Sequence, residues 1–213
     1  MGKEDSLIMV VKTSDLFKGN SFNDFLPHSI RNYESIILNN YGFITRRFAE
    51  EDSNYKQPIA YSMIVNSNTK QVFAFQRSKK TENYGEKRLQ GKFSWGVGGH
   101  VEKYDLEFTN PIRESMLREL YEEVDIRGAV NPNPLILGYI NDDSNNVGKV
   151  HFGILYLHET DAEEIKPRDP EIDNGRLRTM NELEEICESK DFDVESWSKI
   201  ALNPLKAYFL NSH

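Results

Sequence analysis

Two stretches decide the fold: GGHVE at residues 98–102 and RELYEEVDI at residues 118–126. The second stretch is typical of a helix, and the helical period places residues three and four apart on one face. Glu119, Glu122 and Glu123 therefore converge. Three carboxylates repel one another unless a cation neutralises them, and oxygen ligands favour magnesium, manganese or calcium over zinc. The spacing predicts a site for a divalent metal ion.

A solvated acidic helix face is the ordinary alternative for such a run of glutamates. The glycines upstream favour the metal site. Gly98 and Gly99 permit a backbone geometry that directs carbonyl oxygens at an ion or lets a phosphate approach closely. An ordinary tight turn is the competing interpretation for these two residues.

Together, the two stretches resemble the Nudix box: a glycine, five residues, a glutamate and seven residues, followed by Arg-Glu-apolar-x-Glu-Glu-x-Gly-apolar. The second half matches except at Asp125, where the box has glycine, a replacement that a left-handed backbone would tolerate. The first half is longer, because Gly99 and Arg118 lie five residues further apart than in the family pattern. The box glutamate then falls on Asn110, next to an insertion at residues 103–109. Its supporting role is vacant or passes to Glu102, Glu107 or Glu114.

The resemblance implies the α/β (α+β) class, as a Nudix-type α/β/α sandwich with a mixed sheet flanked by helices. It also implies a pyrophosphohydrolase that depends on a divalent metal, Mg²⁺ or Mn²⁺. The enzyme would cleave a phosphoanhydride bond in a small nucleoside-diphosphate-type substrate. The predicted metal ligands are Glu119, Glu122, Glu123 and the backbone carbonyl of Gly99.

Within the same helix, Glu119 and Glu122 are the predicted catalytic residues, and Glu122 is the first choice of general base. Arg118 is poorly suited to be a base and is expected to orient the carboxylates. Some members of the family draw the base from a loop far downstream. The acids available in that part of the chain are Glu163, Glu164 and Glu171.

Substrate contacts are predicted at three further residues. Arg77 ends a strand and Arg88 follows in a loop, and each can offer two donors to phosphate oxygens. Gly98 would let phosphate approach the backbone. For the two arginines, an exposed basic loop is the competing interpretation. His100 and His151 are expected to be hydrogen-bonded structural residues.

Periodicity and turn residues divide the chain into three zones. An N-terminal extension at residues 1–56 is expected to pack on a Nudix domain at residues 57–190, and a C-terminal helix at residues 191–213 is expected to belong to the same globule. Residues 57–61 and 95–100 also look like a group of Nudix-like proteins that carry such an extension. The chain is thus predicted to be one globule around a Nudix core.

Within these zones, two apolar runs at residues 59–65 and 71–77, separated by a turn-rich segment, predict a hairpin. Pro204 predicts a kink or break in the last helix. Helices are predicted at residues 29–40, 110–124, 180–188 and 196–210.

Charge and composition exclude several classes of protein. The net charge of −8 argues against a binder of nucleic-acid polymers, which needs a basic face, but leaves room for a small anionic nucleotide-like substrate. The chain has no apolar run of about 18 residues, so no membrane partner is predicted and the expected compartment is the cytoplasm. The family suggests a homodimer.

Two rivals to hydrolysis follow from the same residues. A non-catalytic Nudix-fold module that binds or senses a nucleotide is favoured by the altered first half of the box and by Asn110. Isoprenoid-diphosphate isomerase-like chemistry would need a catalytic cysteine or similar acid near the substrate, and the single cysteine, Cys187, lies well outside the box. The glutamates of the helix favour hydrolysis over both.

Overall fold

The structure, a computed structural model, describes residues 3–80, 89–107 and 109–211. The chain divides into two compact units, of which the first comprises Met1–Tyr61, Gly98–Arg118 and Ile136–Leu155 and the second Ser62–Val97, Glu119–Leu135 and Tyr156–His213. Four described elements contribute residues to both units: strand β4 (Tyr55–Asn66), helix α4 (Pro111–Glu123), strand β8 (Leu135–Asn141) and strand β9 (His151–Thr160).

The strands of the first unit form antiparallel pairs. β1 (Leu7–Lys12) pairs with β3 (Tyr41–Thr45) and, through Val11 and Lys56, with β4. β2 (Asp24–Pro27) pairs with β8 (Leu135–Asn141). The four inner residues of β1, which are all apolar, are buried.

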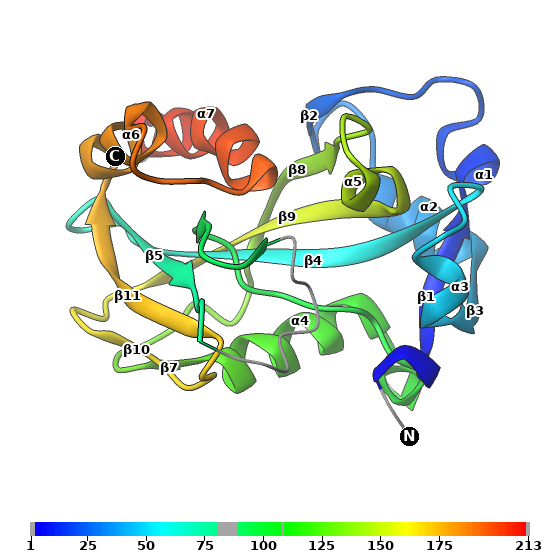
Figure 1. Ribbon diagram of the computed structural model, residues 1–213, viewed down its shortest axis with the longest axis horizontal. Helices are drawn as coiled ribbons and strands as arrows, with labels where there is room; N and C mark the ends of the chain where they lie inside the picture. The colour runs from blue at the N-terminus through cyan, green and yellow to red at the C-terminus, as the bar shows by residue number, and fades with distance from the viewer. Residues whose placement is uncertain (1–2, 81–88, 108, 212–213) are drawn as a thin grey trace. The chain divides into compact units, whose positions relative to one another are not determined.

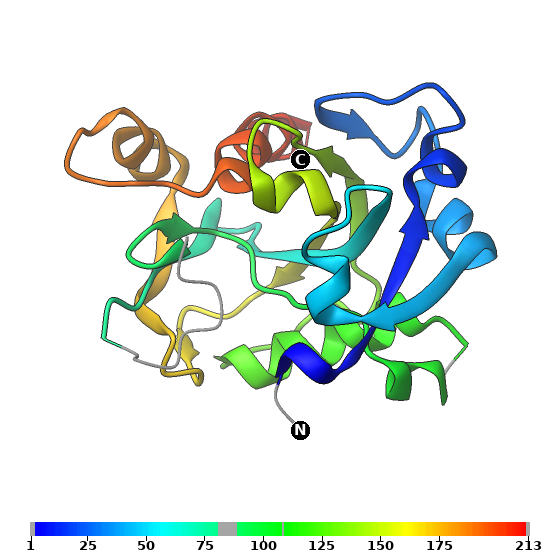
Figure 2. The same cartoon turned by 45° about the vertical axis from the view of Figure 1, so that its right-hand side comes forward.

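Short helices surround the β1–β3 pair. These are α1 (Thr13–Phe17), α2 (Tyr33–Asn40) and α3 (Arg46–Ala49), and the turned view of Figure 2 brings them forward from their place in Figure 1. α2 begins later than the predicted residue 29. Asn32 is its N-cap, since its side chain accepts a hydrogen bond from the Ser35 backbone at 2.9 Å, and the chain before it is not helical.

Five aromatic rings form part of the core of the first unit. Their centroids lie 5.2 to 6.1 Å apart, mostly edge to face, which is the favoured arrangement of aromatic pairs. They come from segments far apart in the sequence. The rings are those of Phe17, Phe22, Tyr33, Tyr139 and Phe152.

The second unit is built on β5 (Gln71–Arg77). This strand pairs antiparallel with β4, with β11 (Ile172–Thr179) and with the short β6 (Phe93–Ser94). The turn between β4 and β5 is held by Asn66, whose side chain accepts hydrogen bonds from the backbone of Asn68 and Thr69. The predicted hairpin is confirmed.

The sheet is mixed and flanked by helices, which confirms the predicted α+β class. β4 and β9 are neighbours in the sheet, and both run from residues of the first unit to residues of the second. This pair is therefore parallel, whereas the pairs described above are antiparallel. Every residue of β4 after Tyr55 is buried, so both faces of this strand are covered. A second, two-stranded sheet joins β7 (Val124–Ile126) to β10 (Ile165–Pro167).

Helices α6 (Met180–Glu188) and α7 (Ser196–Asn211) follow β11 and contact each other. Thr179 and Glu182 form a reciprocal capping box that fixes the start of α6 at the predicted residue. α7 continues through Pro204, so the expected break is not present. Among the described helices, none is long and apolar enough to cross a membrane.

The acidic helix packs through one face on the core of the second unit. Leu120 of α4, together with Val124 at the start of β7, is buried with Ile64 of β4 and with Phe73 and Phe75 of β5. A helix that buries one face must turn other positions away from the core. This packing therefore sets the direction of the glutamates.

Gly98 belongs to the first unit and lies against β4. Its φ is +152°, and a Cβ there would lie 2.0 Å from the carbonyl oxygen of Ala60. We expect Gly98→Ala to lower the free energy of unfolding by about 2 kcal/mol or more, because the backbone cannot yield without breaking strand contacts. Urea denaturation measures this change.

The matched control is Gly42→Ala in β3, where an added Cβ meets nothing within 4 Å. We expect that change to stay within about 0.5 kcal/mol. Equal effects of the two substitutions would show that close packing at Gly98 is not what requires glycine.

Candidate active site

The acidic helix α4 starts from a well-defined cap. The side chain of Asn110 accepts hydrogen bonds from the backbone N–H groups of Ile112 and Arg113, each at 3.1 Å, and Pro111 occupies the first helical position. Both residues are favoured at these places. The residue that stands where the box has glutamate therefore begins the helix.

Arg118 is held by Asp105, a residue of the predicted insertion. The insertion contains a 3₁₀ helix, η3 (Lys103–Glu107), and Asp105 accepts from Arg118 Nε at 3.3 Å and from Nη2 at 3.2 Å. Nη2 also lies 3.1 Å from the backbone carbonyl of His100 and 3.2 Å from Ser115 Oγ. Because the Asp105 side chain is 3% exposed and that of Arg118 19%, this is a nearly buried two-point ion pair.

Asp105 therefore makes the carboxylate contact to Arg118 that we expected of Glu102, Glu107 or Glu114. The sequence alone offered a signal, since Asp105 is one of the acids of the insertion. Asp105 Oδ2 also accepts a hydrogen bond from the Glu102 backbone N–H at 2.8 Å. The extra residues thus supply a buried carboxylate to Arg118, and the orienting role of Arg118 stays a prediction.

The second half of α4, in the second unit, carries the three glutamates. Glu119 is partly buried, Glu122 is exposed and Glu123 is 7% exposed. The last turn of the helix contains no basic residue. Carboxylates are unfavourable there because the helix dipole places partial negative charge at the C-terminus.

Arg168 caps this acidic end from outside the helix. Its backbone N–H donates to the carbonyl of Glu123 and its Nη1 to that of Tyr121, both at 2.8 Å. Its Nη2 donates to Asp125 at 2.9 Å. Asp125 lies in strand β7 and is absent from the residues with positive φ, so the left-handed backbone expected there is not present.

Arg77 and Arg88 were predicted to contact the substrate, and Gly99 was predicted to bind the metal ion. Arg77 Nε donates to Glu195 at 2.9 Å, and both side chains are largely buried. Ser94 Oγ donates to the other oxygen of the same carboxylate. The Arg77 guanidinium, which we predicted to contact phosphate, takes part in this ion pair. Arg88, the other arginine predicted to contact phosphate, lies outside the described residues. The carbonyl of Gly99 stays a predicted ligand.

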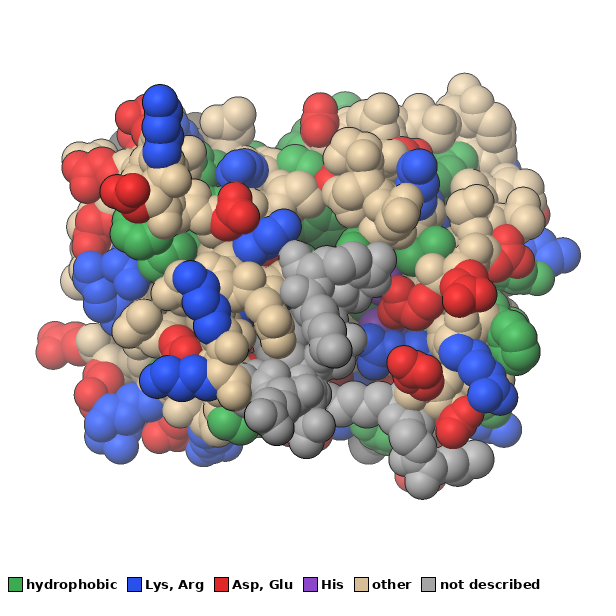
Figure 3. Space-filling view, in the orientation of Figure 1, with side chains coloured by type: hydrophobic (Ala, Val, Ile, Leu, Met, Phe, Trp, Pro, Cys, Tyr) green, Lys and Arg blue, Asp and Glu red, His purple; other side chains and the backbone are tan. Residues whose placement is uncertain are grey.

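The loop acids lie among surface ion pairs. Glu164 pairs with Arg127 at 3.1 Å and with Lys166 at 3.2 Å. Glu163 is exposed. On the described part of the face in Figure 3, acidic and basic side chains are interspersed rather than separated by sign. The contacts of Glu164 favour a surface role for it over that of a general base.

His100 and His151 have the hydrogen bonds expected of structural residues. His100 Nε2 lies 2.7 Å from Gln57 Oε1, and His151 Nδ1 lies 2.7 Å from the carbonyl of Val147. Burial, followed by the charges of Arg46 and His151, lowers the pKa of His100 well below its usual value. The imidazole of His100 is therefore neutral at pH 7.

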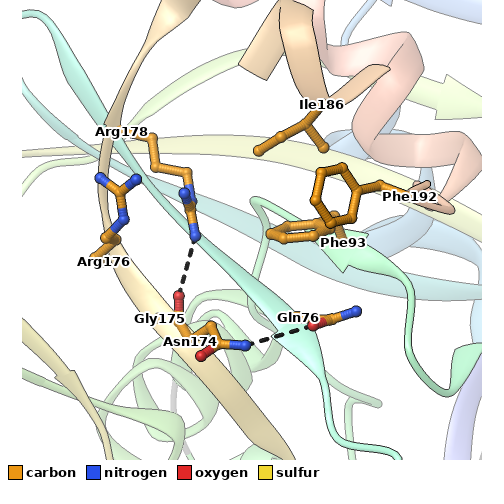
Figure 4. Close-up of a pocket in the computed structure, with 8 residues that line it drawn as sticks. All are labelled: Gln76, Phe93, Asn174, Gly175, Arg176, Arg178, Ile186 and Phe192. Carbon is orange, nitrogen blue, oxygen red and sulfur yellow. Dashed lines mark hydrogen bonds between the residues drawn. The ribbon is translucent and has the colours of Figure 1, made fainter. Parts of the chain in front are cut away.

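A pocket of about 480 Å³ opens in the second unit, a typical size for a ligand site. Phe93 and Phe192 meet edge to face in its wall, with centroids 5.1 Å apart, and the guanidinium of Arg178 lies 5.4 Å from the Phe93 ring (Figure 4). Arg178 Nε is buried with no hydrogen-bond partner among the described residues. Gln76 and Asn174 add amide groups.

Comparison with known proteins agrees with these features. The model of the NUDIX domain family matches residues 56–198. The chain is 33% identical over 217 aligned residues to Protein YmaB of Bacillus subtilis (strain 168), covering 97% of this chain and 100% of that protein.

Solved structures share the fold. Tm1382, assigned to the Nudix hydrolases, superimposes with a TM-score of 0.75 at 26% identity, covering 95% of this chain and 99% of that one. The NUDIX domain of NrtR from Shewanella oneidensis, solved with ADP ribose, gives a TM-score of 0.53 at 10% identity, covering 72% and 88%. The chain thus belongs to the Nudix family. It is a hydrolase of the Nudix type, a class that cleaves pyrophosphate bonds.

Proposed function

We propose that this hydrolase uses a divalent metal ion, Mg²⁺ or Mn²⁺, to cleave a phosphoanhydride bond in a small nucleoside-diphosphate-type substrate. One observation carries the proposal. Three carboxylates, one of them 7% exposed, share the end of α4 with no basic residue in its last turn. Repulsion between the carboxylates and the helix dipole both favour the binding of a cation at this end.

The donor set fits a hard cation. Glu119, Glu122 and Glu123 offer oxygen atoms, which suit magnesium or manganese better than zinc. A bound ion would supply the positive charge that offsets charge developing on the pyrophosphate. We assign Glu122, which is exposed, as the base that takes a proton from the attacking water.

Arg118 has a positioning role in this scheme. Its guanidinium is fixed by Asp105 and by the His100 carbonyl, so the rotation of α4 about its axis is set in the first unit. Glu119 follows Arg118 directly and shares that rotation. These contacts hold the planar guanidinium of Arg118 in place, which suits Arg118 to orienting the helix rather than to transferring a proton.

We further propose that the pocket beside Phe93 receives the part of the substrate remote from the reaction. Its two aromatic rings suit a planar base, its amides suit the base edge, and the Arg178 guanidinium suits an anionic or aromatic group. Arg176, which lines the same pocket, is already paired with Glu182 at 2.7 Å. Arg178 is therefore the proposed contact.

Replacing Arg178 by glutamine tests this role. We expect KM to rise about 10-fold with little change in kcat, because a contact remote from the bond cleaved contributes equally to ground state and transition state. Arg127→Gln, at an exposed arginine of the same unit, is the control. An unchanged KM for Arg178→Gln would remove the pocket from the substrate site.

The proposed activity is tested with a substrate panel. Nucleoside triphosphates, dinucleoside polyphosphates, ADP-ribose and nucleotide sugars are incubated with and without Mg²⁺, and phosphate or nucleotide release is measured. ADP-ribose is included because the NrtR domain holds it on the same fold. We expect turnover of at least one compound, dependent on the ion.

The substrate panel also distinguishes hydrolysis from the two rival functions, a sensor module and isomerase-like chemistry. Binding without turnover, independent of metal, would favour a sensor module. Isomerase-like chemistry is disfavoured, because the single cysteine, Cys187, lies in α6, well outside the box. A cytoplasmic location, a homodimeric state and the exclusion of nucleic-acid polymers stay predictions of the sequence.

A further inference from the structure

Three side chains of the first unit meet although they are far apart in the sequence. Glu50 follows α3, His100 follows the glycine pair and His151 begins β9. One potential ligand atom of each lies within 4.8 Å of the others. None of the three belongs to the acidic face of α4.

The distances fit a transition-metal ion. His151 Nε2 lies 3.3 Å from His100 Nε2, and each of these nitrogens lies 3.8 Å from Glu50 Oε1. A triangle with these sides has a point about 2.1 Å from all three atoms, which is the length of a zinc–nitrogen or zinc–oxygen bond. An ion could therefore enter without a rearrangement of the backbone.

The hydrogen bonds prepare His151 for ligation. Because a carbonyl oxygen only accepts, His151 Nδ1 must donate to Val147, so whenever the ring is neutral its Nε2 carries the lone pair that can face His100 and Glu50. A backbone carbonyl on the other ring nitrogen is the usual support of a metal-bound histidine. The three side chains are 8% to 21% exposed, so the cluster is sheltered without being sealed.

Gln57 gives a second, independent observation. This residue is fully buried, and its Nε2 has no hydrogen-bond partner among the described residues, while its Oε1 lies 2.7 Å from His100 Nε2. Such a buried amide nitrogen is costly. Because an amide oxygen only accepts, His100 Nε2 donates to Gln57 Oε1 in the absence of an ion, so the His100 proton must move to Nδ1 when a metal binds at Nε2. The Gln57 oxygen is then released to bind a water ligated to the ion.

We propose that Glu50, His100 and His151 form a transition-metal site, with zinc as its ion, separate from the carboxylates of α4. Two imidazoles and one carboxylate are a zinc donor set, and imidazole selects zinc over magnesium. Arg46 Nε, 3.6 Å from Glu50 Oε1, is the cation that the ion must displace. Binding would tie α3, the segment after Gly99 and β9 to one another.

The test uses the full chain in excess Mg²⁺, which competes for carboxylate sites and poorly for imidazole. The binding of Zn²⁺ is measured by calorimetric titration. The binding of Co²⁺ is measured by the visible absorption that this ion shows in a site of low symmetry. We expect one ion per chain and a higher melting temperature. Glu50→Gln and His151→Gln should each weaken binding by at least about 100-fold, since loss of even a supporting partner costs roughly 10- to 100-fold.

His28→Gln is the matched control, because His28 is a hydrogen-bonded histidine of the same unit that contacts Tyr139. It should bind Zn²⁺ as the native chain does. Circular dichroism shows that each variant is folded, and Glu50→Gln, close to isosteric, keeps the test valid if a histidine variant unfolds. The proposal is overturned if the native chain binds neither Zn²⁺ nor Co²⁺, or if the cluster variants bind as well as His28→Gln.

Discussion

Glu122→Gln and Glu123→Gln are each expected to lower kcat by at least about 10²- to 10³-fold on the best substrate of the panel, at saturating Mg²⁺. Glutamine keeps the volume of glutamate and removes its charge. The ion then loses an anionic ligand, and in Glu122→Gln the proposed base is lost as well. Initial rates of phosphate release measure the effect.

Glu185→Gln is the control for these variants, because Glu185 is an exposed acid of the same unit that lies in α6 rather than in α4. Its rate should stay close to that of the native chain. Both α4 variants should keep the native circular dichroism spectrum, since a neutral side chain relieves repulsion at the helix end. Native rates in both variants, or full turnover in the presence of a chelator, would exclude the proposed site.

The second large effect is expected at the buried pair formed by Asp105 and Arg118. Asp105→Asn keeps the shape of the side chain but removes the charge of the carboxylate that makes a two-point contact with the Arg118 guanidinium in a largely buried place. We expect the free energy of unfolding to fall by about 3 kcal/mol, because removing one charge of a buried ion pair is strongly destabilising. Urea denaturation measures this loss, and kcat should fall with it as α4 loses its fixed rotation.

Glu107→Gln is the matched control, an exposed acid of the same short helix η3. We expect it to change stability by less than about 0.5 kcal/mol. Adding Arg118→Met to Asp105→Asn should recover part of the loss, because no charge is then stranded. Equal stabilities of Asp105→Asn and Glu107→Gln would show that the ion pair contributes little.

The sequence predicted elements whose signal is local. The period of apolar residues placed the acidic helix within one residue of its observed bounds, Pro111–Glu123, and the turn residues after Val65 placed the hairpin. The bounds predicted for α6 from its helix-like pattern agree with the structure, where Thr179 and Glu182 cap the start of the helix from within three residues. Such features depend on neighbours in the chain and can be read from it.

Contacts across long separations could not be predicted in this way. Arg77 meets Glu195, which is 118 positions away, and nothing near either residue indicates the other. The same holds for Glu50 with the two histidines. Asp105 was missed for a different reason, since residue spacing alone does not show which acid of an inserted loop turns toward Arg118.

The cap that Arg168 places on α4 joins the acidic end to the segment that carries β10. Three of its donors reach the helix end or Asp125, so opening that segment would release carbonyls of Tyr121 and Glu123. The free energy of opening this segment and the affinity for an ion are then linked. An ion that binds the end of α4 only while Arg168 caps it would stabilise the segment by mass action. By this linkage, the segment that carries Arg168 would take part in setting how tightly the enzyme binds the proposed ion.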